Sequence, residues 1–255
     1  MTIQVRRADY QDVEAMRGLY RQELNCQIIR DSFLSRGLAD PYLILVDGRL
    51  GGYGAVSNKY DKGRLTEYYT LPHARRLALP MFRELLAACQ ATHIEAQTNN
   101  PLMLLMLYDC ARNITAENIL FHDAFATHLA CPNGIFRSAD PGNAGAIFPH
   151  QREPVGDWVI EAQGTVVATG GFLCHYNPPY GDIFMEVAEP ARRQGFGSYM
   201  VQELKRVCYE AGKKPAARCN ADNIGSRRTL EKAGFLPCGR LLVGEVNPPA
   251  HLAVV

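Results

Sequence analysis

The residues whose types and spacing could do chemistry are concentrated in one stretch of the chain, residues 182–235. It opens with an apolar run, 182–188, that contains one carboxylate, Glu186. The segment Arg192-Arg193-Gln194-Gly195-Phe196-Gly197-Ser198 follows and leads into an amphipathic segment, 199–210. This order predicts a strand that enters a helix through a glycine turn.

A turn of this kind is suited to binding an anion. The first N–H groups of a helix have no intrahelical partner and carry the positive end of the helix dipole, so a phosphate binds there readily. Gly195 and Gly197 let an anion approach the backbone closely, and the two arginines before them add fixed charge. Gly-x-Gly alone is a weak signal. The common nucleotide motifs fit poorly, because Met200 stands at the third glycine of a dinucleotide fingerprint and no lysine precedes Ser198.

The downstream half of the stretch narrows the interpretation. Residues 217–221 are a short strand candidate, and the segment from Asp222 to Ser226 opens a helix that ends at Gly234-Phe235. Arg-x-x-Gly-x-Gly at 192–197, Asn-x-x-Ser at 223–226 and Glu-Lys-Ala-Gly-Phe at 231–235 follow one another in this order. With these motifs the stretch resembles the GNAT superfamily of acyl-CoA-dependent N-acyltransferases.

The resemblance implies a fold and a set of cofactor contacts. The fold class is α/β with a mixed sheet of α+β type, in which the strand at 182–188 splays from its neighbour and admits the pantetheine arm of acetyl-CoA. Backbone groups near Val187 and Ala188 would pair with that arm, and the amides from Gln194 to Ser198 would hold the pyrophosphate. The expected cofactor-binding residues are Val187, Ala188, Arg192, Arg193, Gln194, Gly195, Phe196, Gly197, Ser198, Asn223 and Ser226.

Acyl transfer from a thioester also needs a group that takes the amine proton, and Glu186 is the first candidate. Its apolar neighbours in the strand predict partial burial, which would raise its pKa toward the working pH. A strand glutamate in a salt bridge or facing solvent is the structural alternative. Glu161 and Glu189 are weaker candidates that we expect to be exposed.

The acid that protonates the departing thiolate is less defined. Many members of the superfamily carry a tyrosine at the eighth position of the second motif, where this chain has Leu230. Ser226, Tyr199 and Cys219 remain open as replacements, as does water, and Ser226 joins Glu186 as a candidate catalytic residue. Because leucine cannot donate a proton, the departure also fits a domain that binds acyl-CoA without turnover.

Several flanking features have both a functional and a structural interpretation. Asn223 fits a helix N-cap as well as a cofactor contact. A solvated helix face explains Arg227, Arg228 and Lys232 better than contacts to nucleotide phosphates do. Residues 174–180, Cys-His-Tyr-Asn-Pro-Pro-Tyr, could line an acceptor pocket, although an ordinary proline-bearing loop is slightly favoured.

Length and composition exclude several classes of protein. The length of 255 residues is enough for two ordinary domains or one large one, and 47% hydrophobic and 21% charged residues are typical of a globular protein. The formal net charge of +1 gives no broad basic field for nucleic acid. The N-terminus lacks the apolar core of a signal peptide, and no apolar run is long enough to span a membrane. The eight cysteines show no metal-ligand spacing with the histidines. We expect a cytoplasmic protein, monomeric or homodimeric, with reduced thiols and with no metal, membrane or nucleic-acid partner.

The order of the predicted elements occurs twice. Residues 3–9, which include the first predicted strand, are matched by residues 134–140. The turn Asp47-Gly48 is matched by Gln163-Gly164, and Ala74-Arg75-Arg76 by Ala191-Arg192-Arg193. A repeat of this length predicts two tandem domains of one fold, 1–129 and 130–255. In the second copy, residues 141–155 are rich in Gly and Pro, so we expect its first helices to be missing or irregular.

The first copy lacks the phosphate turn. Residues 75–80 read Arg-Arg-Leu-Ala-Leu-Pro where 192–197 read Arg-Arg-Gln-Gly-Phe-Gly, so both glycines are replaced and Pro80 has no N–H to donate. We therefore expect domain 1–129 to be structural or substrate-shaping and domain 130–255 to bind acetyl-CoA. The predicted function is acetyl transfer from acetyl-CoA to a primary amine of a small-molecule or peptide acceptor. A non-catalytic acyl-CoA sensor or scaffold is the alternative, and a protein-interaction module that binds no CoA is a third hypothesis.

Overall fold

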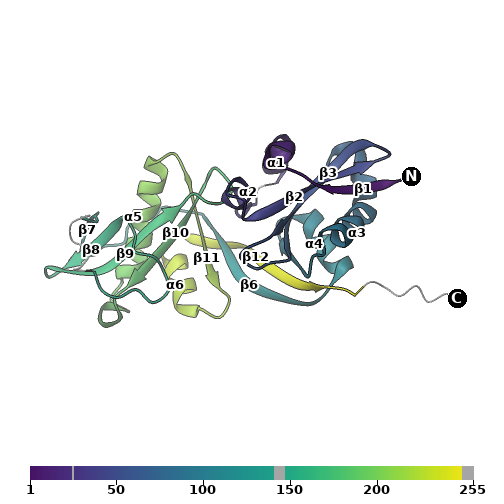
Figure 1. Cartoon of the computed structure of the whole chain (residues 1–255). Coiled ribbons are helices and arrows are strands. Elements are labelled where there is room, and N and C mark those ends of the chain that lie inside the picture. Colours follow the sequence, from purple (N-terminus) through teal and green to yellow (C-terminus); the bar gives the residue numbers. More distant parts are fainter. Residues whose placement is uncertain (25, 141–146, 249–255) are drawn as a thin grey trace. The chain divides into compact units, whose positions relative to one another are not determined.

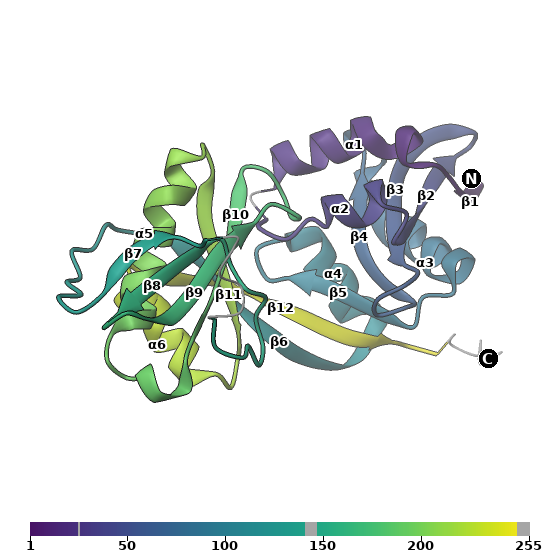
Figure 2. The ribbon, with the colours of Figure 1, turned by 60° about the vertical axis from the view of Figure 1, so that its left-hand side comes forward.

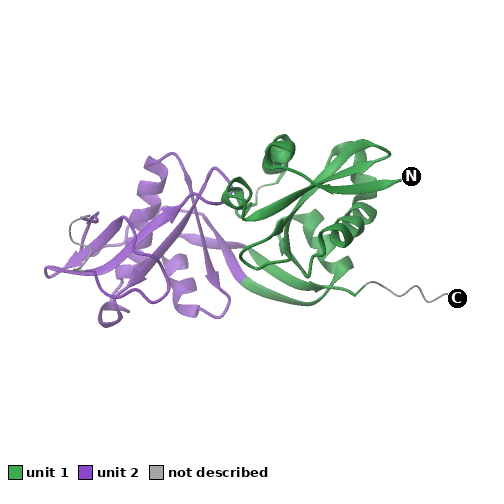
Figure 3. Cartoon of the chain, viewed as in Figure 1, with its two compact units in different colours: residues 1–117, 239–255 green, residues 118–238 purple. Residues whose placement is uncertain are grey.

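The computed structural model describes residues 1–24, 26–140 and 147–248 (Figure 1). The chain divides into two compact units (Figure 3): unit 1 comprises residues 1–117 and 239–255, and unit 2 comprises residues 118–238. Two strands, β6 (Ala111–Asp123) and β12 (Phe235–Val246), contribute residues to both units. The boundary at 129/130 stays a prediction about where one sequence copy ends and the next begins. The compact units of the structure have different boundaries, at 117/118 and 238/239.

Unit 1 is a mixed sheet with helices on both faces, and its strand order is β1-β2-β3-β4-β5-β12-β6 (Figure 2). Its elements are β1 (Ile3–Arg7), α1 (Tyr10–Glu23), α2 (Asp31–Ser35), β2 (Ala39–Val46), β3 (Arg49–Ser57), β4 (Arg64–Thr70), the 3₁₀ helix η1 (Pro72–Leu77), α3 (Ala78–Cys89), β5 (His93–Gln97) and α4 (Pro101–Cys110). Phe82 of α3 packs in one core with Ile44, and Val13 of α1 packs in another with Leu43. Adjacent strand residues point to opposite faces, so the two cores lie on opposite sides of the sheet.

Unit 2 carries both of its helices on one face, and its strand order is β12-β6-β11-β10-β9-β8-β7. Its elements are β7 (Ile135–Ser138), β8 (Trp158–Ala162), β9 (Thr165–Leu173), β10 (Tyr180–Val187), the 3₁₀ helix η3 (Glu189–Ala191), α5 (Phe196–Glu210), β11 (Lys214–Asn220) and α6 (Ile224–Lys232). Leu204 of α5 and Leu230 of α6 share a core with Ile183. Of the segment expected to be irregular, residues 141–146 lie outside the described residues, and residues 147–155 contain no helix or strand.

The two predicted hairpins are confirmed. The turn residues Asp47 and Gly48 both have positive φ, 46° and 78°, and so do Gln163 and Gly164, 51° and 74°. Two consecutive residues of this kind make the type I′ turn that matches the twist of paired strands. β2 pairs with β3 across the first turn, and β8 pairs with β9 across the second, so both copies contain the same antiparallel hairpin.

No helix in the described ranges is long and apolar enough to cross a membrane. Among these residues, no group of three or more His, Cys, Asp and Glu side chains is arranged to hold a metal ion.

Candidate functional site

Two neighbouring parallel strands of unit 2 are paired only where they begin. β10 and β11 are in register from Tyr180 to Asp182, although β10 continues to Val187. On its other edge β10 stays paired with β9 as far as Val187. The parallel strands therefore diverge after Asp182 and leave a gap in the sheet, which confirms the splay that the sequence predicted.

One edge of β10 faces this gap. The N–H of Ala188 donates to the carbonyl of Val167 in β9 (2.9 Å), so the backbone groups of Val187, one residue earlier, point the other way. Val187 therefore presents its N–H where an extended ligand arm would pair with it, while its carbonyl accepts from the Nε of Arg192 (3.3 Å). Ala188 presents neither group, because its N–H bonds to Val167 and its carbonyl accepts from the N–H of Ala191 (2.9 Å).

Beyond β10 the chain forms a concave turn at the start of α5. Arg193 and Gly195 have left-handed backbone conformations, with φ of 64° and 92°. The first hydrogen bond of the helix runs from the N–H of Tyr199 to the carbonyl of Gly195 (3.1 Å). The N–H groups of residues 196–198 precede this bond and are suited to an anion, whereas the resemblance implied a longer run of amides, from Gln194 to Ser198.

The two glycines of the turn have different roles. A Cβ on Gly195 would meet no atom within 4 Å, but its φ of 92° is one that other residues rarely adopt. A Cβ on Gly197 would lie 3.2 Å from Cε of Met185 and 3.3 Å from Cγ2 of Thr229. Gly195 is therefore needed for the backbone conformation of the turn, which borders open space. Gly197 is needed because α5 lies close to β10 and α6.

The gap and the turn open into one pocket of about 580 Å³. It is lined by the end of β10, the turn, the first turn of α5, residues along the length of α6, and residues 151–153. Of the predicted site residues, the pocket brings together Glu186, Val187, Arg192, Arg193, Gly195, Gly197, Ser198, Asn223 and Ser226. It does not include the side chains of Ala188, Gln194 and Phe196: Gln194 bonds to the carbonyl of Pro190 (3.2 Å), and Phe196 lies in the core.

The start of α6 forms the opposite wall. The side chain of Asn223 accepts the N–H of Ser226 (3.0 Å), so it caps the helix while it lines the pocket. Arg228 and Lys232 also line the pocket, and with Arg192 and Arg193 they make this end strongly cationic. Arg227 is not among the lining residues and pairs with Glu231 (2.8 Å).

Comparison with known proteins decides the family. The profile of the Acetyltransferase (GNAT) family matches residues 121–235, and the profile of an Acetyltransferase (GNAT) domain matches residues 9–124. The chain belongs to the GNAT acetyltransferase family. It carries two domains of this family in tandem, and membership implies acyl transfer from an acyl-CoA.

Solved structures share the fold over nearly the whole chain. An acetyltransferase of the GNAT family from Colwellia psychrerythraea matches with a TM-score of 0.77 at 16% identity, covering 97% of this chain and 100% of that one. A tandem GNAT protein of the clavulanic acid biosynthesis pathway, solved without AcCoA, matches with a TM-score of 0.58 at 12% identity, covering 97% and 99%. No curated protein sequence is significantly similar.

Within the GNAT pocket, Glu186 is buried as predicted, but its pKa moves in the other direction. Oε1 accepts the N–H of Gln151, and Oε2 accepts those of Arg152 and Glu153, all at 3.0 Å. Burial works to raise the pKa of Glu186, but these three amides and the nearby His150 outweigh it, so the pKa is lowered. The expectation of a raised pKa was wrong, because a strand pattern predicts burial but does not show which backbone N–H groups meet the carboxylate.

Sequence reasoning missed a second carboxylate in the pocket, that of Glu153. It lies in a segment without regular structure, more than thirty residues before Glu186, and no motif points to it. Glu153 as a whole residue is exposed, but the protein atoms around its carboxyl group desolvate it enough to raise its pKa; the charge of Arg218 opposes this shift, and the charge of Glu186 adds to it. The weaker candidates are elsewhere: Glu161 pairs with Arg137 (2.8 Å), and Glu189 is exposed in η3.

The loop 174–180 contributes a polar cluster beside the gap. Arg218 of β11 pairs with Asp182 of β10 (Nε to Oδ2, 3.2 Å) and donates to the hydroxyl of Tyr176 (2.6 Å). Its guanidinium also stacks over the Tyr176 ring, 4.7 Å from the centroid. The pKa of Asp182 is raised to about 6, because burial outweighs the attraction of Arg218.

Of the possible acids, only Ser226 lines the described pocket. Leu230 is buried in the core of unit 2, and so is Cys219, next to the Ser226 side chain. Tyr199 lines a different hollow. The position that carries a tyrosine in many GNAT proteins is thus filled by a packing residue.

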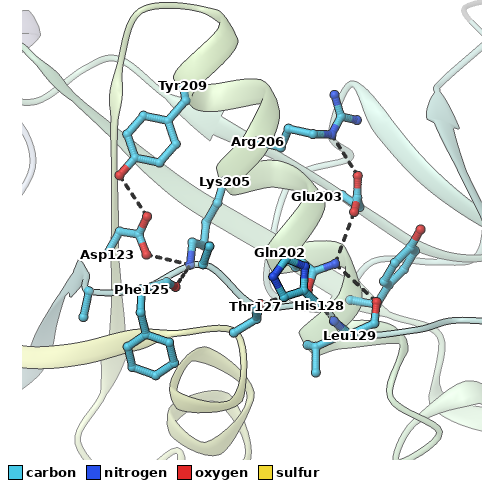
Figure 4. Close-up of a pocket in the computed structure, with 13 residues that line it drawn as sticks. Asp123, Phe125, Thr127, His128, Leu129, Gln202, Glu203, Lys205, Arg206 and Tyr209 are labelled. Carbon is cyan, nitrogen blue, oxygen red and sulfur yellow. Dashed lines mark hydrogen bonds and ion pairs between the residues drawn. The ribbon is translucent and has the colours of Figure 1, made fainter.

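That different hollow, about 730 Å³ in volume, lies between α5 and residues 123–129 (Figure 4). Most of its polar groups are satisfied by one another. The Nζ of Lys205 contacts Asp123 (2.6 Å) and the carbonyl of Phe125 (2.8 Å), and Gln202 accepts from the Thr127 hydroxyl (2.8 Å). These contacts hold the connecting segment on the helix, so we interpret this hollow as structural.

Unit 1 has the splay but not the turn. β4 and β5 are paired at only two positions, Arg64–His93 and Leu65–Ile94. The 3₁₀ helix η1 ends at Leu77 and α3 begins at the next residue, whereas residues 192–195 separate the equivalent helices in unit 2. Unit 1 therefore lacks the concave loop that presents amides in unit 2.

Buried side chains of α1 and β3 also enclose a carboxylate of β4 in unit 1. Glu67 of β4 accepts from Arg17 (Nη2 to Oε1, 2.9 Å) and from the hydroxyl of Tyr53 (3.0 Å), and all three side chains are almost completely buried. Arg75, the counterpart of Arg192, is paired with Glu23. These contacts favour the expected structural or substrate-shaping role of the first copy.

Proposed function

We propose that unit 2 transfers an acetyl group from acetyl-CoA to a primary amine of a small-molecule or peptide acceptor. One observation carries the proposal: the gap beyond Asp182 and the amides at the start of α5 open into the same pocket. A CoA thioester needs both features, because its pyrophosphate needs an anion site and its long arm needs an open strand edge.

Different residues of the pocket would bind different parts of acetyl-CoA. The N–H groups of residues 196–198, with Arg192 and Arg193, would hold the pyrophosphate. The backbone of Val187 would pair with the pantetheine arm and fix the thioester beside the incoming amine, where orientation lowers the barrier. Among the candidate acids, Ser226 is the one that lines the described pocket, and its hydroxyl would give a proton to the departing thiolate.

A non-catalytic acyl-CoA sensor is the second candidate, and Leu230 favours it. Its side chain is 5% exposed and packs in the core, so it cannot supply the proton that a tyrosine supplies in many relatives. Binding without thiol release would identify a sensor, whereas thiol release in the presence of an amine would identify an enzyme.

The proposed site is tested by titrating the purified protein with acetyl-CoA in a calorimeter. We expect one molecule per chain, and an affinity at least about 100-fold weaker in Gly195→Asp, since a carboxylate would stand where the pyrophosphate binds. Gly212→Asp is the matched control. Gly212 also has a positive φ, 69°, and a Cβ there would meet no atom within 4 Å, but this glycine lies after the other end of α5.

Equal weakening in both variants would mean that strain, not charge at the turn, explains the loss. Two molecules per chain would show that unit 1 binds the cofactor as well. Absence of binding to the native protein would contradict both the enzyme and the sensor.

A further inference from the structure

The segment that holds Glu153 crosses the face of the unit 2 sheet opposite to α5 and α6. Glu186 alternates along β10 with Met185 and Val187, which pack on the core beneath the helices, and its partner in register, Thr169 of β9, follows Ala168 of that core, so both lie on the opposite face. His150 connects the sheet and the segment: its Nε2 lies 3.0 Å from the Thr169 hydroxyl of β9, and its Nδ1 lies 2.8 Å from the carbonyl of Glu153. The segment is therefore fixed on the sheet beside the gap.

Glu186 makes the strongest of these attachments. Both of its oxygens are occupied, by the N–H groups of three consecutive residues, 151–153. A carboxylate that accepts several backbone N–H groups is stabilised as the anion and is a poor proton acceptor. The residue at the expected position of the base thus works as an anchor for the backbone of the segment.

The anchored segment presents Glu153 to the pocket. The Glu153 side chain lines it together with Met185 and Val187 of the open strand edge. In the described part of the chain its carboxylate makes no hydrogen bond or ion pair, in contrast to Glu186 and Asp182. It is therefore the pocket carboxylate with its oxygens left for a ligand.

We propose that Glu153 accepts the proton of the acceptor amine, and that Glu186 is a positioning residue that holds Glu153 beside the thioester. This inference rests on the proposed acetyl transfer. An ammonium group of the acceptor gives one proton to Glu153, and the lone pair of its nitrogen forms the C–N bond to the thioester carbonyl. The C–S bond then breaks, the sulfur leaves with the electron pair, and the second proton lost by nitrogen passes to the thiolate through Ser226 or water.

The electrostatic surroundings suit Glu153 to this role. The charges that act on it are Glu186 and Asp182 of β10, Arg218 of β11 and His150 of its own segment. Desolvation of its carboxyl group and the charge of Glu186 raise the pKa of Glu153 toward the working pH, while Arg218 and His150 oppose this shift. A base with a pKa nearer the operating pH is the more effective one.

The test measures thiol release from acetyl-CoA, with 1,4-diaminobutane as the probe amine, across the pH range. We expect Glu153→Gln to lower kcat by about 100-fold or more and to remove the acidic limb of the profile. We expect Glu186→Gln to lower kcat but to keep the acidic limb. The limb should move to lower pH, because removal of the negative charge of Glu186 lowers the pKa of Glu153. Glu189→Gln is the control, since Glu189 is exposed and does not line the pocket.

The outcomes separate this inference from the proposed function. Calorimetric binding of acetyl-CoA to all variants, with wild-type kcat in Glu153→Gln, would overturn the inference and leave the proposed function in place. Failure of the native protein to bind acetyl-CoA would overturn both. If the native protein binds but does not turn over the probe amine, an NMR titration of the glutamate carboxyl carbons decides: a pKa of Glu153 at the ordinary value of about 4.3 would refute the assignment.

Discussion

At the scale of single residues, Glu186 and Asp182 beside the gap differ in the groups that stabilise their charged carboxylates. Glu186 has three backbone N–H groups, which lower its pKa. Asp182 has one guanidinium, that of Arg218, and this does not offset its desolvation, so its pKa is raised to about 6. The number of hydrogen bonds to the anion decides the direction of the shift in each case.

The raised pKa of Asp182 predicts a specific pH dependence of stability. An unfolded aspartate has a pKa of about 3.9, so between about pH 4 and pH 6 the folded state binds a proton that the unfolded state has lost. The Asp182 contribution to the free energy of unfolding therefore falls as the pH rises through this window, by about 3 kcal/mol in total.

Urea unfolding of the native protein and of Asp182→Asn at several values between pH 4 and pH 7 measures this contribution. We expect the stability of the native protein relative to the variant to decrease as the pH rises. Asp157→Asn, at an exposed position, should leave the profile unchanged. Parallel profiles for the native protein and Asp182→Asn would contradict the assignment.

The residues of this site whose roles are local could be predicted from the sequence. Gly195 and Asn223 are of this kind, because a turn with positive φ and a helix cap each depend on a few adjacent residues. Glu153 could not be predicted, because it reaches the pocket only through contacts between its segment and β10. The direction of the Glu186 shift was missed for the same reason, since its three partners are far away in the chain.

At the scale of elements, α5 carries the proposed anion site at its first turn and is anchored further along. There Lys205 contacts Asp123 (2.6 Å) and the carbonyls of Phe125 and Ala233 (both 2.8 Å). Lys205 is 4% exposed, so its charge is neutralised almost entirely by these partners. Figure 4 shows the Lys205 side chain directed at Asp123 and Phe125.

We expect Lys205→Met to destabilise the protein by about 3–5 kcal/mol, because the largely buried Asp123 would lose its counter-charge. Chemical denaturation measures the change. Adding Asp123→Leu to Lys205→Met should recover part of the loss, since a buried pair can be replaced by apolar groups at little cost. Lys214→Met, at an exposed position, should change stability by less than about 0.5 kcal/mol. A similar small effect of Lys205→Met would show that the contact contributes nothing.

Elements with a strong local pattern could be predicted, and the two strands that join the units could not. The hairpins and α3 follow from turn residues and apolar spacing. β6 begins at Ala111 with a largely polar half, and β12 contains Pro237 and Gly239, which usually interrupt strands. Pairing with neighbours, not propensity, makes these segments strands: β12 pairs with β5, and β6 pairs with β11.

At the scale of the whole molecule, each unit is completed by a strand segment from the other copy in the sequence. In unit 1, residues 241–245 of β12 pair with β5. In unit 2, residues 118–122 of β6 pair with β11. A cut between the sequence copies, at 129/130, would therefore remove a strand from each sheet.

This arrangement predicts that the fragment 118–238 folds and binds acetyl-CoA, whereas the fragment 130–255 does not fold stably. The first fragment keeps the whole of unit 2 and its pocket. The second loses Ile119 and Phe121, which are 3% and 0% exposed in the core, and leaves β11 without its β6 partner. Loss of buried side chains of this size costs about 3–5 kcal/mol each, of the order of the total stability of a small domain.

Circular dichroism, thermal unfolding and calorimetric titration of the two fragments compare them directly. We expect a cooperative transition and one acetyl-CoA site in 118–238, and neither in 130–255.

Unit 1 can be tested in the same way. The N–H of Asn247 bonds to the carbonyl of Cys110, and the N–H of Ala124 bonds to that of Gly234, so β6 and β12 run antiparallel. A short Asn-Gly turn can therefore join residue 117 to residue 239. Residues 1–117 so joined to 239–248 should fold where 1–129 does not. Cooperative unfolding of 1–129 and 130–255 as isolated fragments would show instead that each sequence copy is a complete domain, and that the strand segments from the other copy are dispensable.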